Sequence, residues 1–259
     1  MTSGLVGPAS VAWKIDRERA LMLGGGRALL MQLAHPRVAR GVAEHSDFRR
    51  RPFRRLARTT TLSFDLVFGD RDRVRNAVRR INAAHATVRG EGYSAFDADL
   101  LLWVFATLVD SGVHAYELFI GSLTDAEKDL YYEEELRVAH LLGLPRSAAP
   151  AGFEGLRAYV REQIASGVVR VDDTGREMGR ATLYPRHARY LPRVVLDAGA
   201  LLVAGLLPRT LRRQFELPWS LRHQAAFEVF VRLARAAVPR LPPPIRYMPQ
   251  ARDARRRVP

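Results

Sequence analysis

The sequence contains no cysteine in its 259 residues. This absence excludes disulfides, thiolate metal sites and cysteine nucleophiles, and it leaves the redox compartment of the protein open. Histidine and the carboxylates remain as the side chains that can ligate a metal ion.

Lysine is nearly absent as well, since it occurs only at Lys14 and Lys128. Almost all of the 41 basic residues are therefore arginines, and with 27 acidic residues they give a formal net charge of +14. A solvated arginine-rich surface, an anionic membrane, a nucleic acid and the anionic groups of a cofactor are all compatible with this charge. The hydrophobic share of 47% is ordinary for a soluble globular protein.

Long hydrophobic runs are missing too. The longest apolar stretch, residues 194–207, contains Asp197 and falls short of the ~20 residues that a membrane-spanning helix needs, so it predicts a buried core helix. The N-terminus lacks the basic and apolar segments of a secretory signal, and we expect a cytoplasmic protein. The basic residues within 246–257 favour weak, salt-sensitive contact with anionic lipid.

Convincing strand patterns are few, because apolar residues recur mainly at the three- and four-residue steps of helices. Only residues 168–182 alternate in a way that favours a small hairpin. We expect an all-α fold of about eight to ten helices in a single domain over residues 13–240. Segments 1–12 and 241–259 are expected to be flexible, and the proline- and arginine-rich composition from Pro239 onward favours disorder.

Several common enzyme motifs are absent. The chain has no Gly-x-Ser-x-Gly elbow, Walker loop, His-Glu-x-x-His motif or EF-hand loop. A glycine cluster at 24–26 follows residues that look helical, so it does not suit a phosphate loop. Close approach of another helix or of a flat cofactor explains these glycines better, in a helix over 15–33 that bends there. The acidic run at 133–135 is interpreted as a solvated helix face.

Residues 72–89 predict an amphipathic helix that turns a histidine inward. His85 and, one turn later, Arg89 share the apolar face, and Gly90 follows as the expected C-cap. The apolar face consists of Val74, Ala77, Val78, Ile81, Ala84 and Val88. A buried imidazole needs a partner, which can be a carbonyl, a carboxylate, a water or a metal. A satisfied core histidine and a metal ligand are therefore both open.

Two further helices carry polar groups among apolar ones. Over 53–68, Arg55, Arg58 and Thr59 share a stripe with leucines, and over 97–120 His114 follows Asp110 by one turn. His114 is either a core histidine bonded to Asp110 or a second ligand candidate. One inward imidazole with arginines nearby suits haem, whose propionates pair with arginine. Arginines that bind nucleic-acid phosphates should instead lie exposed among aromatic residues, so we expect no specific nucleic-acid partner.

Five segments, in their order and spacing, resemble the catalytic domain shared by the latex-clearing rubber oxygenases and the MpaB-type oxygenases. They are Gln32-Leu33-Ala34-His35-Pro36, Arg55-Leu56-Ala57-Arg58-Thr59, Val67-Phe68-Gly69, His85-Ala86-Thr87-Val88-Arg89-Gly90 and Trp103-Val104-Phe105-Ala106-Thr107-Leu108. The tyrosine-rich stretch 129–134 is also similar, and the resemblance spans roughly 13–240.

The resemblance implies an all-α fold that holds haem b and uses dioxygen on apolar, often isoprenoid, substrates. His85 matches the proximal iron ligand of that family, and Arg89 matches the arginine one turn after it. Arg55, Arg58 and Thr59 match the polar residues of the distal helix, and the resemblance implies that Arg55 also binds the cofactor.

The sequence departs from the family pattern at three places. The rubber enzymes have lysine where this chain has Arg58, which keeps the charge but not its geometry. Many relatives have histidine where this chain has Phe105. The distal carboxylate base of rubber cleavage has no certain match, and His35 or Glu44 stands near that place.

The function expected from the sequence is a haem b-dependent oxidoreductase, an oxygenase that acts on a small or medium apolar substrate. The alternatives are a haem-binding sensor or carrier without turnover, and a basic membrane-surface or nucleic-acid binding module without haem. The expected pocket is mainly apolar and is closed in part by Gly24, Gly25 and Gly26. Its expected lining is Leu29, Leu30, Leu33, Leu62, Leu66, Trp103 and Leu108.

Overall fold

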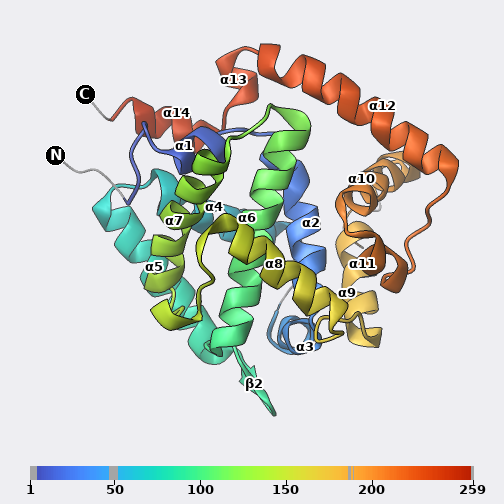
Figure 1. Ribbon diagram of the computed structural model, residues 1–259, viewed down its shortest axis with the longest axis horizontal. Helices are drawn as coiled ribbons and strands as arrows, with labels where there is room; N and C mark the ends of the chain where they lie inside the picture. Colours follow the sequence, from blue (N-terminus) through green and yellow to red (C-terminus); the bar gives the residue numbers. More distant parts are fainter. Residues whose placement is uncertain (1–4, 47–51, 186–187, 189, 258–259) are drawn as a thin grey trace.

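The computed structural model describes residues 5–46, 52–185, 188 and 190–257, and for residues 52–58 it describes the backbone alone. This part of the chain is all-α, with one two-stranded ribbon (Figure 1). Ten of its helices have ten or more residues, as the sequence predicts, and four short ones add to them. The helices are α1 (Val11–Asp16), α2 (Leu21–Leu33), α3 (Pro36–His45), α4 (Pro52–Phe68), α5 (Arg71–Thr87), α6 (Ala98–Phe119), α7 (Asp125–Leu141), α8 (Gly152–Ala165), α9 (Asp173–Leu183), α10 (Arg193–Leu206), α11 (Arg209–Gln214), α12 (Leu221–Ala237), α13 (Pro243–Arg246) and α14 (Pro249–Arg255), and the strands are β1 (Arg89–Gly90) and β2 (Tyr93–Ser94).

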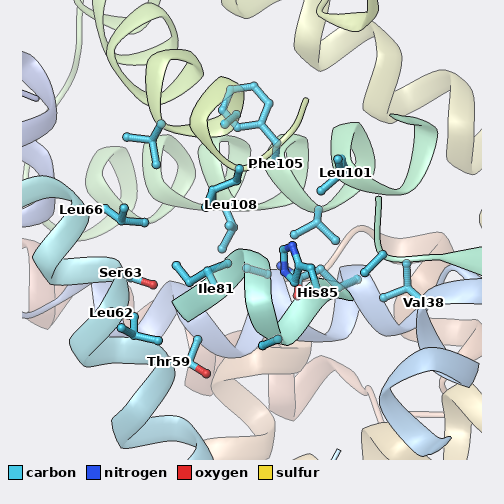
Figure 2. Close-up of a pocket in the computed structure, with 18 of the residues that line it drawn as sticks. Val38, Thr59, Leu62, Ser63, Leu66, Ile81, His85, Leu101, Phe105 and Leu108 are labelled. Atoms are coloured by element: carbon cyan, nitrogen blue, oxygen red, sulfur yellow. The ribbon is translucent and has the colours of Figure 1, made fainter. Parts of the chain in front are cut away.

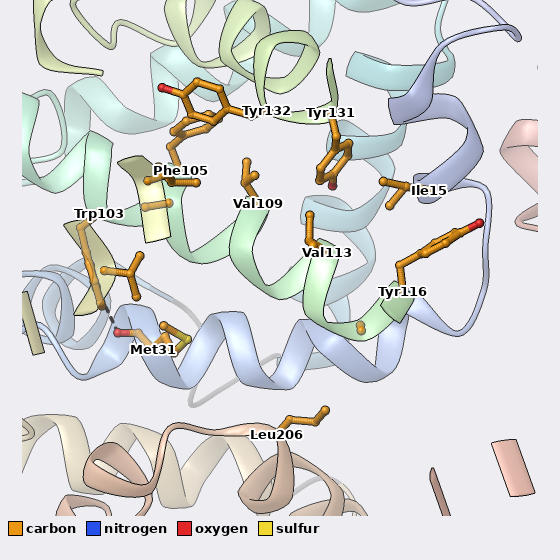
Figure 3. Close-up of a cluster of buried hydrophobic side chains, with 14 of the residues drawn as sticks. Ile15, Met31, Trp103, Phe105, Val109, Val113, Tyr116, Tyr131, Tyr132 and Leu206 are labelled. Carbon is orange, nitrogen blue, oxygen red and sulfur yellow. Dashed lines mark hydrogen bonds between the residues drawn. The ribbon is translucent and has the colours of Figure 1, made fainter. Parts of the chain in front are cut away.

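The 22-residue helix α6 runs through the middle of the molecule and packs against α2, α7, α8 and α12 (Figure 1). Its apolar residues extend almost all round the helix, which is typical of a buried element. Trp103 is buried on it and donates its indole N–H to the carbonyl of Met31 across 3.1 Å (Figure 3). By length and composition alone α6 would also suit a membrane span, and 56% of that stretch is buried within the molecule.

Helix α2 continues through the three glycines without a break, so the predicted bend there is wrong. The chain breaks earlier, over 17–20, between α1 and α2. A Cβ at Gly24 would lie 2.8 Å from Cβ of Ala115, and one at Gly26 would lie 2.5 Å from Cγ2 of Val203. Two of the glycines thus allow α6 and α10 to approach α2 closely, as expected from the glycine cluster.

A buried arginine links the same three helices. Arg27 donates to the carbonyl of Leu206 (3.0 Å), to Oγ of Ser111 (2.6 Å) and to Oδ2 of Asp110 (2.5 Å). Asp110 and Ser111 of α6 therefore help α2 to pack against α6 and α10 through their hydrogen bonds to Arg27.

Helix α5 begins at an aspartate cap and ends two residues before its predicted end. Asp70 accepts a hydrogen bond from the backbone N–H of Arg73 (2.9 Å), which satisfies an amide of the first turn. After Thr87 the chain becomes extended, and Arg89 and Gly90 pair with Ser94 and Tyr93. The prediction that the helix includes Arg89 and is capped by Gly90 is therefore wrong, because cross-strand pairing takes these residues.

Two other expectations from the sequence pattern are wrong. Residues 173–183 form α9 instead of a hairpin strand, because Asp172 caps that helix by accepting from the N–H of Gly175 (2.7 Å). Helix α10 lies largely at the surface, with Val194 70% and Val195 51% exposed. The apolar pattern alone did not reveal that few helices cover it.

The segment after Pro239 is helical and packed, whereas its composition predicted disorder. The guanidinium of Arg246 binds the fully buried carboxylate of Glu18 at 2.7 Å. Ala251 and Ala254 of α14 are buried, and α14 packs on α4. Long-range contacts of this kind are absent from any local sequence pattern.

Candidate active site

A cavity of about 1420 Å³ lies among α2, α3, α4, α5, α6 and α7. It is larger than the ~300–1,000 Å³ of most small-molecule sites, so it has room for more than one small ligand. Apolar side chains make up most of its wall (Figure 2), among them Val38, Leu62, Leu66, Ile81, Leu101 and Leu108. This agrees with the apolar pocket predicted from the sequence.

The structure brings His85 to the wall of this cavity, in the last turn of α5 (Figure 2). Its Nδ1 is buried and has no hydrogen-bond partner among the described residues. The ring lies edge-on to Phe96, with centroids 5.8 Å apart. Burial lowers the pKa of His85, which favours the neutral imidazole that can ligate a metal. No side chain or backbone group of the described residues satisfies this nitrogen, and the role of His85 as a metal ligand stays a prediction.

The distal residues predicted from the resemblance lie on α4. Thr59 lines the cavity, together with Leu62 and Ser63 of the following turn (Figure 2). Arg55 and Arg58 belong to the same helix, but their side chains lie outside the described residues. The predicted roles of both arginines therefore stay predictions.

The structure separates Arg89 from the cavity. Arg89 lies exposed on β1 and is not among the lining residues that the structure describes. The prediction that it continues the His85 face is wrong, because the helix ends at Thr87.

His35 is buried at the N-cap of α3 and also does not reach the described cavity wall. Its Nδ1 has no partner among the described residues, and burial, followed by the charge of Arg37, lowers its pKa. Glu44 accepts a short hydrogen bond from the hydroxyl of Tyr93, a residue of the wall. Neither His35 nor Glu44 opens onto the cavity as a base would.

His114 does not compete with His85 for a ligand in this space. It is absent from the described cavity wall, and burial, followed by the charge of Arg27, lowers its pKa to about 4. Asp110, its expected partner, accepts from Arg27 instead.

The predicted leucine lining is partly correct. Leu62, Leu66 and Leu108 face the cavity, and Leu108 is 53% exposed although it lies on the central helix. The remainder of that predicted set, Leu29, Leu30, Leu33 and Trp103, is not among the described lining residues. Helical spacing identified these residues as apolar, but not which side of α2 and α6 each would face.

The glycine cluster contributes directly to the wall. Gly24 and Gly25 both line the cavity, and a Cβ built on Gly25 would have no atom within 4 Å. Gly25 thus leaves open space on the cavity side of α2. The prediction that the glycines border the pocket is met by Gly24 and Gly25, whereas Gly26 packs against Val203 and is not among the described lining residues.

A polar cluster in the wall was missed by the sequence reasoning. Asp16, Tyr131 and Glu135 line the cavity together, and the hydroxyl of Tyr131 donates to Oδ1 of Asp16 across 3.1 Å. Burial raises the pKa of Asp16 to about 7. Burial and the neighbouring Asp16 raise the pKa of Glu135 well above its ordinary value.

The prediction that the acidic run 133–135 forms a solvated helix face holds for Glu133 alone. Glu134 accepts from the backbone N–H of Ala12 (2.6 Å), while Glu135 faces the cavity. The usable signal was the spacing of Tyr131, Glu135 and Val138, which places all three on one face of α7.

Two buried polar atoms of the described wall lack any hydrogen-bond partner: Nδ1 of His85 and Oε1 of Glu135. Buried polar atoms are normally paired, so each is a candidate contact for a bound group. The described residues hold no cluster of three or more histidine, cysteine or carboxylate side chains that could bind a metal ion. A haem iron, by contrast, needs only one such ligand from the protein.

Residues 13–236 match the family described as the catalytic domain of the ER-bound oxygenases mpaB/B' and rubber oxygenase, and the chain belongs to this family. The match covers most of the chain, as the sequence resemblance indicated. Two mycobacterial relatives, the uncharacterized protein Mb2261 of Mycobacterium bovis and the uncharacterized protein Rv2237 of Mycobacterium tuberculosis, are each 29% identical over 222 residues. The aligned region covers 81% of this chain and 85% of either relative. No solved structure matches significantly.

Proposed function

We propose that this protein is a haem b-dependent oxygenase that acts on an apolar substrate of small or medium size. Membership in the oxygenase family suggests the reaction class. The observation that carries the cofactor assignment is the unpartnered imidazole of His85 in the wall of a large, mostly apolar cavity. Bound there, haem would supply the iron that activates dioxygen.

The residues present fit such a group. His85 offers a neutral ring nitrogen, which is the form that ligates iron. Gly25 leaves room beside α2 for a flat ring system. Arg80, which also lines the cavity, is exposed and forms no ion pair with the described residues, so it is available for a propionate. Arg55 and Arg58 remain additional candidates from the family pattern.

The protein's own contribution to the reaction is binding, orientation and exclusion of water. Leu62, Leu66 and Leu108 provide apolar surface for a hydrocarbon substrate, at roughly 25 cal/mol for each Å² that the substrate buries. Phe105, where many relatives have histidine, lines the same cavity and adds to its apolar character. The wall therefore favours hydrocarbons over sugars or nucleotides.

The size of the cavity favours an oxygenase over a haem carrier without turnover. A volume of about 1420 Å³ exceeds the usual single-ligand site and leaves space for a substrate beside a cofactor. Oxygen consumption with apolar substrates separates these two functions. A basic membrane or nucleic-acid binding module without haem would show no absorption in the Soret region.

The decisive experiment is a visible spectrum and a pyridine haemochrome assay on the purified protein and two variants. We expect a haem b spectrum that is lost in His85→Ala and kept in His114→Ala, a control at a half-buried histidine outside the described cavity wall. Circular dichroism confirms that both variants fold. Unchanged haem content and spectrum in folded His85→Ala would refute the assignment.

A further inference from the structure

Most polar side chains in the cavity wall satisfy one another or the backbone. The amide of Gln32 donates to Oγ1 of Thr107 (3.3 Å), and Oγ of Ser111 accepts from Arg27 (2.6 Å). The hydroxyl of Thr87 donates to a backbone carbonyl of its own helix (2.8 Å). Groups paired in this way have little to offer a ligand.

Glu135 is an exception. Its Oε1 accepts no hydrogen bond from an N–H or hydroxyl group of the described residues, although the residue belongs to the cavity wall and its carboxyl group is hydrogen-bonded to that of Asp16. Leaving a buried acceptor unpaired costs free energy, about 1–3 kcal/mol for an ordinary group and more for a charged one. A bound molecule with a hydrogen-bond donor would remove this cost.

The surroundings of Glu135 form a specific polar corner. Tyr131, one turn earlier on α7, directs its hydroxyl to Asp16. Gly112 of α6 makes room for this hydroxyl, because a Cβ at that position would lie 2.6 Å from it. The corner is thus built from three helices, α1, α6 and α7.

This corner and His85 lie toward opposite ends of α6. His85 contacts Phe96, just before α6 begins at Ala98, whereas the Tyr131 hydroxyl meets Gly112. The 14 residue-to-residue steps from Ala98 to Gly112 span about 21 Å at a helical rise of about 1.5 Å per residue. Between the His85 end and the polar corner, α6 presents Leu101, Val104 and Leu108 to the cavity.

We propose that the substrate is an extended hydrocarbon chain with a single hydroxyl group, which donates a hydrogen bond to Oε1 of Glu135 while the chain lies along the apolar face of α6 toward His85. The inference deepens the proposed function by naming a substrate class for the same cavity. A hydroxyl fits better than an ammonium group, because a neutral donor loses less solvation when it enters an apolar cavity.

The test compares two isomers, 1-decanol and methyl nonyl ether, which have the same atoms but differ in the hydrogen-bond donor. Displacement of an apolar fluorescent probe from the purified protein measures both affinities. We expect 1-decanol to bind about tenfold more tightly, which corresponds to about 1.4 kcal/mol. Equal affinities, or tighter binding of decylamine than of 1-decanol, would overturn the proposal.

Variants locate the interaction. Glu135→Leu should reduce the preference for the alcohol to less than about twofold, whereas Glu135→Gln, which retains a carbonyl acceptor, should keep part of it. Glu133→Leu, an exposed position on the same helix, should leave the preference unchanged. Gly112→Ala places a methyl group against the Tyr131 hydroxyl and leaves Glu135 itself unchanged. This variant should weaken the preference for the alcohol, and it replaces Glu135→Leu as the test if Glu135→Leu does not fold. An undiminished preference in folded Glu135→Leu would refute the role of this carboxyl.

This binding measurement does not need iron, so its outcome is independent of the haem assignment. A preference for 1-decanol in protein that shows no haem would support the hydroxyl site and refute the proposed oxygenase. Haem binding through His85 without any preference for the alcohol would support the proposed oxygenase and refute the hydroxyl site.

Discussion

Arg27 of α2 and Asp110 of α6 form an ion pair of 2.5 Å whose side chains are only 7% and 13% exposed. The same guanidinium also binds Ser111 and the carbonyl of Leu206, so a single side chain joins three helices next to the cavity. Ser111 itself lines the cavity, which makes this network part of the support of the candidate site.

Removing Arg27 should therefore destabilise the whole fold. We expect Arg27→Ala to lower the free energy of unfolding by about 3–5 kcal/mol, because it leaves the Asp110 carboxylate buried without its partner. Urea denaturation measures the change. Arg73→Ala, which removes an exposed arginine near Asp70, should cost about 1 kcal/mol or less. Equal costs for the two variants would contradict the structural role of Arg27.

Neighbouring glycines of α2 should respond differently to the same substitution. Gly26→Val should destabilise the fold by about 1–3 kcal/mol, because its side chain would collide with Val203 of α10. Gly25→Val places its side chain in open cavity space, so it should impair haem uptake or substrate access more than folding. Thermal unfolding and haem titration separate these effects. The prediction fails if Gly25→Val is the more destabilised variant.

The dependence of stability on pH should change when Asp16 is replaced. Burial raises the pKa of Asp16 from 3.8 to about 7, so the folded state binds more protons than the unfolded state between these values. The contribution of this group to stability is therefore lost as pH rises through that window. We compare the free energy of unfolding of Asp16→Asn with that of the unsubstituted protein. The difference should favour Asp16→Asn more at about pH 8 than at about pH 5, because only the unsubstituted protein loses the contribution of Asp16 as pH rises.

The measurement is urea denaturation of both proteins at the two pH values. His114 acts in the opposite direction, because its pKa is lowered from 6.5 to about 4 and its contribution is lost as pH falls. Since both proteins contain His114, the difference between them cancels its effect. A difference that does not vary with pH would show that Asp16 titrates normally.

Arg58 should affect ligands of the iron more than the haem itself. The prediction rests on its match to the distal helix of the family and on the presence of Thr59, the next residue, in the cavity wall. We expect Arg58→Ala to change cyanide affinity severalfold at nearly constant haem content, because a distal cation acts on the bound ligand. Spectral titration with cyanide measures both. Loss of haem with unchanged cyanide affinity would instead make Arg58 a propionate partner.

The C-terminal arginines should give weak, salt-sensitive binding to anionic vesicles. Arg255 and Arg256 are exposed, whereas Arg246 is held by Glu18, so fewer charges are available than the sequence suggests. At about 1 kcal/mol for each basic residue near such a surface, the double Gln variant of Arg255 and Arg256 should sediment less with vesicles at low salt. A matched double Gln variant of the exposed residues Arg71 and Arg79 on α5, which do not line the described cavity, is the control. Binding that persists at high salt would indicate hydrophobic insertion instead.

Local signals in the sequence determined where most helices lie. Thr124 and Glu127 form a capping box at the start of α7, and Asp70 caps α5, because each side chain satisfies amides only a few residues away. The inward position of His85 followed from the period of α5 in the same local way. The resemblance that named the family also rested on short segments in a fixed order, and the match to residues 13–236 confirms it.

Only the tertiary structure decided what each helix face meets. Helical spacing shows which residues share a face, but it does not tell whether that face packs on another helix, borders a cavity or remains open to solvent. Helix α10 is exposed despite its apolar sequence, and Glu135 is half-buried and faces the cavity despite its acidic neighbours. Asp16 and Tyr131 meet although 115 positions separate them. Burial, and with it the pKa of a carboxyl or the pairing of an imidazole, depends on such distant segments, so the polar corner of the cavity became visible only in the folded chain.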